Sequence, residues 1–113
     1  HHRDESIHQI QDSLDEHFSG PVSFKDLAGN AGMSKSTFLR RFERATGEKP
    51  ARYLQRLRVE AAKHRLINSD DNIKAISINV GYQDISHFSK VFKSVAAYSP
   101  RSFRNRYRPR KKG

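Results

Sequence analysis

Cysteine is absent from this sequence of 113 residues. A disulfide framework and a thiolate metal site are therefore excluded, and the absence fits a reducing compartment such as the cytoplasm. No stretch is apolar enough for a transmembrane helix, and no signal peptide is recognisable, so no membrane partner is predicted. No segment alternates between apolar and polar residues for long enough to indicate a β-strand. The sequence therefore predicts an all-α protein.

The residue patterns of common catalytic and metal sites are also missing. His8, His17 and His64 have no cysteine or histidine partner at the spacing of metal ligands, so we predict no metal site. No serine–histidine–acid spacing, glycine-rich phosphate loop or carboxylate pair stands out. We therefore expect no cofactor, no catalytic residue and no enzymatic activity.

Positive charge is abundant and unevenly distributed. The 22 basic and 12 acidic residues give a formal net charge of +10. Residues 1–33 contain two basic residues against six acidic ones, whereas residues 34–113 contain the other 20 basic residues. A polyanionic partner, above all nucleic acid, is the natural interpretation. Non-specific binding of nucleic acid or a membrane surface through the basic end, residues 108–113, is an alternative.

One pattern of residues occurs twice, at an offset of 49 and then 50 positions. Each copy reads as a short helix, a glycine turn, a longer helix, a stop and a proline. This order is typical of a helix-turn-helix, whose second helix can lie in a DNA major groove. The matching residues are Leu27, Ala28, Ala31, Gly32, Phe38, Phe42, Gly47, Pro50 and Tyr53 in the first copy and Ile76, Ser77, Val80, Gly81, Phe88, Phe92, Ala97, Pro100 and Phe103 in the second.

The periodicity predicts seven helices in a bundle-like domain. Two helix-turn-helix subdomains, 5–48 and 68–107, are joined by a long central helix over 49–67, whose apolar residues spread over more than one face. Because the chain opens on two histidines without a methionine, residues 1–4 are interpreted as a tag remnant or a disordered end. The chain is accordingly expected to be a piece of a longer protein, and 108–113 form a basic tail.

Residue types with known capping roles mark the helix ends. Ser23, Ser34 and Asp84 are predicted to cap three helices, and Asp71 or Asn72 a fourth. Ser99 and Pro100 are predicted to open the last helix. Phe38, Phe42 and Ala45 are expected on the inner face of the first recognition helix, and Phe88, Val91, Phe92 and Val95 on that of the second.

The outward positions of the two longer helices are the candidate DNA contacts. Near the N-terminal half of a recognition helix, polar side chains meet base edges. We assign this role to Ser36, Leu39 and Arg40 in the first copy and to Ser86, His87 and Lys90 in the second. Because arginine can contact guanine through two atoms, the first copy is expected to read its bases more sharply. Leu39 can touch a thymine methyl group, although an exposed leucine is also ordinary.

Phosphate contacts are expected from basic residues and helix starts at the shoulders of these helices. A solvated face is the alternative for each residue taken alone. Asp84 would repel phosphate, so it is assigned only a capping role. The phosphate-contacting residues are predicted to be Ser34, Lys35, Arg41, Arg44, Lys93, Arg101 and Arg104.

The run Gly81-Tyr82-Gln83-Asp84-Ile85-Ser86-His87-Phe88-Ser89-Lys90-Val91-Phe92-Lys93, followed by Ser99-Pro100, resembles the signature of the AraC/XylS family of bacterial transcription regulators. The first copy is similar to that family's first helix-turn-helix, and the resemblance covers about residues 5–107. It implies a seven-helix domain that binds double-stranded promoter DNA through successive major grooves and usually activates transcription through RNA polymerase. It also implies a location on the nucleoid, and a larger N-terminal sensing or dimerising domain in the whole protein.

The family resemblance has one clear departure, at the end of the second recognition helix. Ala97 stands where the family commonly has glycine. Alanine tolerates positive φ poorly, so this helix end is expected to be reshaped or strained. The base-reading residues implied by the resemblance are the six already assigned from the helix pattern.

The expected DNA site covers about two turns, with recognition helices one turn or roughly 34 Å apart. Its two halves should differ, because the two helices differ in sequence. The rival hypothesis is a protein-interaction module, in which Leu39 and the basic central helix dock an acidic partner such as a polymerase.

Overall fold

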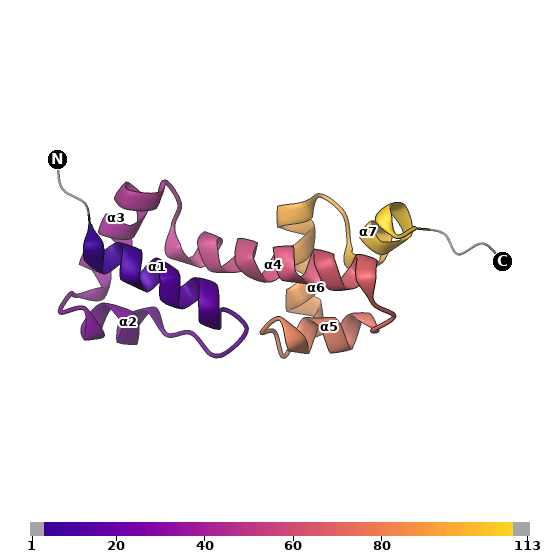
Figure 1. Cartoon of the computed structure of the whole chain (residues 1–113), viewed down its shortest axis with the longest axis horizontal. Helices are drawn as coiled ribbons and strands as arrows, with labels where there is room; N and C mark the ends of the chain where they lie inside the picture. The colour runs from indigo at the N-terminus through magenta and orange to yellow at the C-terminus, as the bar shows by residue number, and fades with distance from the viewer. Residues whose placement is uncertain (1–3, 110–113) are drawn as a thin grey trace. The chain divides into compact units, whose positions relative to one another are not determined.

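Seven α-helices make up the computed structural model, which describes residues 4–109 (Figure 1). No strand occurs in this part of the chain, so the all-α prediction is confirmed. Two of the helix pairs form the two predicted helix-turn-helix motifs. The helices are α1 (Glu5–His17), α2 (Phe24–Asn30), α3 (Lys35–Thr46), α4 (Pro50–Asn68), α5 (Ile73–Asn79), α6 (Ile85–Ala96) and α7 (Pro100–Tyr107).

The two predicted ends lie mostly outside the described residues. Residues 1–3 of the proposed tag remnant and residues 110–113 of the basic tail are not described. Asp4 is described and forms an ion pair with Arg41. Arg108, at the start of the predicted tail, forms an ion pair with Asp70.

The chain divides into two compact units between Leu54 and Gln55, inside α4. In the first unit, α1, α2 and α3 bury one apolar face each, and Tyr53 from the start of α4 joins them. Phe38, Phe42 and Tyr53 form a continuous aromatic row with ring centroids 5.7 and 5.4 Å apart. The buried hydrophobic residues of this unit are Ile7, Ile10, Leu14, Ala28, Phe38, Phe42 and Tyr53.

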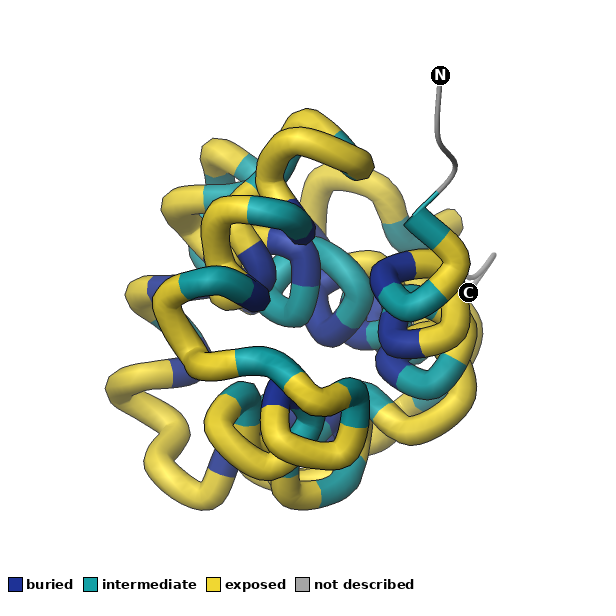
Figure 2. The backbone as a smooth tube through the Cα atoms, turned by 90° about the vertical axis from the view of Figure 1, so that its left-hand side faces the viewer, coloured by how far each residue is buried: buried dark blue, intermediate teal, exposed yellow. Residues whose placement is uncertain are grey.

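The second unit repeats this construction with equivalent residues. Phe88, Phe92 and Phe103 form the same row, with ring centroids 5.8 and 5.5 Å apart. Dark blue buried stretches alternate with exposed yellow ones along the helices, as amphipathic helices around a core require (Figure 2). The buried hydrophobic residues of this unit are Val59, Ala62, Leu66, Ile76, Val80, Tyr82, Phe88, Val91, Phe92 and Phe103.

The turn between the helices of each motif has the same hydrogen bonds in both units. After α2, Met33 donates its backbone N–H to the Ala28 carbonyl at 2.9 Å, with Gly32 at φ +73°. After α5, Tyr82 donates to the Ser77 carbonyl at 2.9 Å. This six-to-one bond around a left-handed residue is the Schellman motif, which satisfies the last carbonyls of a helix and redirects the chain.

Candidate nucleic-acid interface

Local capping and an inner aromatic pair fix the position of α3 within the first unit. The Ser34 hydroxyl accepts a hydrogen bond from the Thr37 backbone N–H at 3.1 Å, as predicted for an N-cap. Gly47 ends the helix at φ +82°. Because Phe38 and Phe42 are fully buried, the opposite face of α3 must point to solvent.

The three predicted base-reading residues of α3 all lie on that exposed face. Ser36 and Arg40 are exposed, and Leu39 is 36% exposed, one of few large hydrophobic side chains on the surface. Ala45 is exposed as well, so its predicted place on the inner face was wrong. At about 100° per residue Ala45 points to the same side of α3 as Phe38, so its exposure reflects its place in the last turn of the helix, one residue before Thr46.

The second recognition helix, α6, is held by the same devices. The Asp84 carboxylate accepts a hydrogen bond from the Ser86 backbone N–H at 2.9 Å, which confirms the predicted cap. Phe88, Val91 and Phe92 are buried, and Val95 is partly buried. The inner face of α6 therefore follows the prediction.

The predicted base-reading residues Ser86, His87 and Lys90 are all exposed on α6. The His87 ring lies edge-on to the Tyr82 ring, with centroids 5.3 Å apart. This contact holds His87 against the turn that precedes the helix. Ser86 and Lys90 extend from the outward side of α6.

The end of α6 retains the backbone geometry that glycine provides in α3. Ala97 lies at φ +71° and donates its N–H to the Lys93 carbonyl at 2.9 Å, as Gly47 donates to Glu43 at 2.8 Å. Of the two outcomes expected for this end, reshaping or strain, the structure has strain, because the left-handed conformation is unfavourable for alanine. Ala97 is the only non-glycine residue with positive φ among residues 4–109.

Five of the seven predicted phosphate contacts are exposed and two are engaged within the protein. The guanidinium of Arg41 binds both carboxylate oxygens of Asp4, at 2.6 and 2.9 Å, and donates to the Met33 sulfur. Arg104 donates to the backbone carbonyls of Leu66 at 2.9 Å and Ser69 at 3.0 Å. The exposed five are Ser34, Lys35, Arg44, Lys93 and Arg101.

Comparison with known proteins identifies this arrangement. A family model described as a helix-turn-helix domain matches residues 27–106, which include both motifs. The chain belongs to the AraC/XylS family of helix-turn-helix DNA-binding domains. The HTH-type transcriptional activator RhaS of Escherichia fergusonii is 38% identical over 91 residues, which cover 80% of this chain and 33% of that protein. The same activator from an Enterobacter species is 35% identical over 101 residues, 89% of this chain and 36% of its own length.

Solved structures share the AraC/XylS-family fold of this chain. The DNA-binding domain of AdpA, solved in complex with a target DNA, has a TM-score of 0.84 and 27% identity, covering 90% of this chain and 92% of that one. The C-terminal domain of AraT, a response regulator from Geobacillus stearothermophilus, has a TM-score of 0.88 over 96% of this chain and 90% of that one; at 22% identity it supports the fold alone. The chain spans about a third of the length of the curated relatives it matches.

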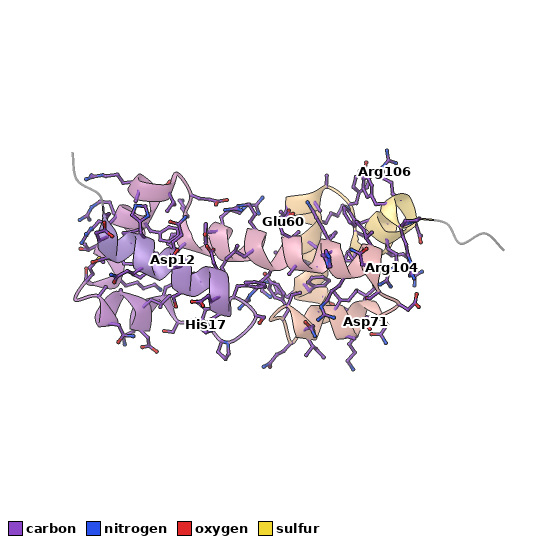
Figure 3. The ribbon with its side chains drawn as sticks, viewed as in Figure 1. Asp12, His17, Glu60, Asp71, Arg104 and Arg106 are labelled. Atoms are coloured by element: carbon purple, nitrogen blue, oxygen red, sulfur yellow. The ribbon has the colours of Figure 1, made fainter. Side chains whose placement is uncertain are left out.

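Two arginines in this AraC/XylS-family domain have structural roles that the sequence did not reveal. Arg104, labelled in Figure 3, satisfies carbonyl groups at the C-terminal end of α4, which carry the negative end of the helix dipole. Arg41 ties the start of α1 to α3 through Asp4. The Arg41 guanidinium also holds the pKa of the Asp4 carboxyl below its ordinary value, against a smaller opposing effect of burial.

Arg58, a basic residue of α4, is buried. Its guanidinium carbon lies 5.0 Å from the centre of the Tyr82 ring. A Cβ atom on Gly81 would come within 2.8 Å of Arg58 Nε, so glycine is required there for close approach as well as for its φ of +116°. Burial raises the pKa of the Tyr82 hydroxyl, and the Arg58 charge partly opposes this shift.

Ile85, the first residue of α6, is 40% exposed, although the sequence pattern did not place it among the outward side chains. The sequence carried a signal for this residue. Ile85 follows the cap Asp84 directly and lies three positions before Phe88, where a helical side chain can still face outward. Ile85 also lies three and seven positions before Phe88 and Phe92, a spacing typical of the inner face, so Leu39 was the one apolar residue assigned to a base contact.

Proposed function

We propose that this chain binds double-stranded promoter DNA sequence-specifically, with α3 and α6 in successive major grooves. The single observation that carries the proposal is the exposure of all six predicted base-reading residues on two capped helices whose buried residues are all apolar. The named activity of the RhaS relatives and the target DNA bound to AdpA support the same interpretation. The biological role that follows is regulation of bacterial transcription, with activation as the direction.

The first recognition helix supplies the sharper reading of sequence. Arg40 presents a planar guanidinium that can donate two hydrogen bonds to guanine O6 and N7, which lysine does less selectively. Leu39 beside it can contact a thymine methyl group. In the second helix Ser86, His87 and Lys90 favour positioning over strict discrimination.

Backbone phosphates are contacted by the exposed basic side chains and by the cap of α3. Lys35 and Arg44 serve the first half of the site, and Lys93 and Arg101 serve the second. Neutralising several phosphates releases counterions, so binding should weaken steeply as salt rises. The proposal does not depend on Arg41 or Arg104, whose guanidiniums are held within the protein.

The wider setting follows from the promoter-binding role. RNA polymerase is the proposed protein partner, and the cytoplasm, on the nucleoid, is the proposed location. A further N-terminal domain that senses a signal or dimerises is proposed for the whole protein, because this chain spans about a third of its curated relatives. We assign the domain a binding role and no catalytic one.

Selection of bound sequences from random duplex DNA is the test of this function. We expect enrichment of one site of about two helical turns with unlike halves, and footprinting should show protection in two successive major grooves. The matched control is the double variant Arg40→Ala, Lys90→Ala, which should lose enrichment while keeping its helical circular dichroism. Absence of enrichment, or protection of a single groove, would refute the proposal.

The salt dependence of binding separates phosphate contacts from base contacts. Lys35→Ala or Lys93→Ala should weaken binding to all sequences similarly and reduce the slope of log affinity against log salt by about 1. Arg40→Ala should instead alter the enriched sequence. An unchanged slope in both lysine variants would contradict the assigned phosphate contacts.

A groove in the first unit favours a second candidate, docking of an acidic protein partner. It is open to solvent and combines apolar with basic lining residues. Because α3 forms one wall of the groove, a docked protein and a DNA major groove would compete for the same surface. The groove is lined by Phe24, Lys35, Ser36, Leu39, Arg40, Glu43, Lys49, Pro50 and Ala51.

A further inference from the structure

Four large hydrophobic side chains are exposed among residues 4–109, and two of them lie on the proposed recognition helices. Leu39 lies in the middle of α3, and Ile85 is the first residue of α6, 40% exposed. The other two, Ile78 and Tyr107, lie on α5 and α7. An exposed isoleucine at the start of a recognition helix needs an explanation other than core packing.

Ile85 lies at the edge of the exposed side of α6, between the buried face and two of the predicted base-reading residues. At about 100° per helical residue, Ile85 lies about 20° from the buried Phe92 and about 100° from Ser86 around the helix axis. The side chains of Ile85, Ser86 and Lys90 are all exposed. Ile85 is the first residue of α6, so it lies at the helix N-terminus, where base edges are read when Ser86 and Lys90 enter a groove.

The first residues of the two recognition helices differ, and the difference favours contact with bases rather than with phosphates at the start of α6. The α3 helix begins with Ser34 and Lys35, a neutral cap followed by a cation. The α6 helix begins with Asp84 and Ile85, an anionic cap followed by an apolar side chain. A carboxylate repels phosphate, so the start of α6 is suited to the floor of the groove and the start of α3 to the DNA backbone.

We infer that Ile85 contacts the 5-methyl group of a thymine in the major groove occupied by α6. This inference rests on the proposed function. Thymine alone among the four bases presents a methyl group in that groove, so an apolar side chain there selects for it. Ile85 is thus a specificity-determining residue in the second half-site.

The same comparison predicts where the two half-sites differ. By the 50-residue offset, Leu39 corresponds to Ser89 and Ile85 to Lys35. The apolar reading position is therefore four residues earlier in α6 than in α3, about 6 Å along the helix axis. In the first half-site, one distance separates the contacted thymine from the base that Arg40 contacts. In the second half-site, the distance between the contacted thymine and the base that Lys90 contacts should be different.

Deoxyuridine differs from thymidine only by the absent methyl group and so tests the contact directly. The duplex is the site enriched by this chain, with each thymine of the α6 half replaced by deoxyuridine, one at a time. We expect one replacement to weaken binding about fourfold, the effect of removing one methyl-sized group from an apolar contact. Ile85→Ala should weaken binding to the thymine site by a similar factor and show no further loss with deoxyuridine.

Two control variants separate the loss of the Ile85 contact with DNA from the general effects of removing an isoleucine. Ile78→Ala removes an isoleucine that is 55% exposed in the same unit and should leave the deoxyuridine effect unchanged. Ile85→Val retains a branched apolar side chain and should preserve most of the effect. Thermal unfolding of all variants should match the parent chain, because neither isoleucine is buried.

The outcomes separate this inference from the proposed function. If the chain enriches no duplex sequence, both fail. If it enriches a site but no deoxyuridine replacement in the α6 half weakens binding, or if Ile85→Ala retains the full deoxyuridine effect, only the inference on Ile85 fails. Loss of the deoxyuridine effect in Ile78→Ala would likewise overturn it.

Discussion

The two units of this domain have the same framework and different surfaces. The aromatic rows Phe38–Phe42–Tyr53 and Phe88–Phe92–Phe103 have ring separations that agree within a few tenths of an ångström. Outward positions, in contrast, share little beyond one serine in each recognition helix. The two copies therefore agree where side chains pack in the core and differ at the positions proposed to touch DNA.

The ends of the recognition helices show a second difference, in how well each is secured. At the end of α3, the Thr46 hydroxyl donates to the Phe42 carbonyl at 2.8 Å and accepts from the Glu48 N–H at 3.2 Å. Gly47 then takes the left-handed conformation without steric cost. At the end of α6, Ala96 has no hydroxyl to make these bonds and Ala97 takes the same conformation with strain.

The equivalence of the two frameworks predicts the largest effects, in the core. Phe38→Ala and Phe88→Ala remove rings that are fully buried at corresponding positions. Each should lower the free energy of unfolding by about 3–5 kcal/mol, because the ring's burial is lost and a cavity remains. Urea denaturation followed by circular dichroism measures the change. A loss below 1 kcal/mol for either residue would contradict the equivalence.

Substitutions of base-reading residues should affect the two units differently, although the core substitutions should affect them alike. Arg40→Ala should reduce discrimination between the preferred and a substituted base pair by about 1–3 kcal/mol, the contribution of a bidentate contact. Lys90→Ala should reduce it by less, while weakening binding overall. Competition binding with single-base variants of the enriched site measures both. If Lys90→Ala relaxes sequence preference as much as Arg40→Ala does, the first unit is not the sharper reader.

The sequence predicted those features that are determined by residues close to one another along the chain. The caps Ser34 and Asp84 form bonds to backbone groups two or three residues on, so residue type and position sufficed. The paired phenylalanines were equally visible, because helical periodicity sorts inner from outer faces. These local rules recovered all seven helices and the exposure of every predicted base-reading residue.

Contacts between residues far apart in the chain were beyond sequence reasoning. The Arg41–Asp4 pair joins residues 37 positions apart, and the Arg104–Leu66 bond spans 38. Burial of Arg58 depends on how α4 packs beneath the Gly81 turn. A basic residue on a predicted helix face has the same signature whether it meets solvent, phosphate or a distant carbonyl, so charge alone could not separate these roles.

Exchanging the residues at the two helix ends should move stability in opposite directions. Gly47→Ala introduces a side chain at φ +82° and should destabilise the domain by about 1–2 kcal/mol. Ala97→Gly removes the strain at φ +71° and should stabilise it by about 1 kcal/mol, less the entropy gained by the unfolded chain. Thermal unfolding of both variants is the measurement. Destabilisation by Ala97→Gly would show that this alanine is not strained.

The smallest predicted effect concerns Arg41, because the corresponding residue of the second unit is apolar rather than charged. Arg41 in α3 is ion-paired with Asp4, whereas the corresponding residue of α6 is the buried Val91. Asp4→Asn should lower the free energy of unfolding by about 0.5–1 kcal/mol at pH 7, a modest value because the pair is partly exposed to water. Asp12→Asn, which neutralises an exposed acid on α1, the helix that Asp4 precedes, is the matched control and should change stability by less.

The pH dependence of that difference identifies the ion pair as its cause. Since the pKa of Asp4 is lower in the folded protein than its ordinary value of 3.8, the folded state holds its proton less tightly than the unfolded one. The stabilisation is therefore complete above the ordinary pKa and disappears as pH falls through the lower folded-state value. The free energies of unfolding of the parent and Asp4→Asn should accordingly converge once the pH is below the folded-state pKa of Asp4. A difference that persists there would mean that Asp4 acts through its shape at the start of α1 rather than through its charge on Arg41.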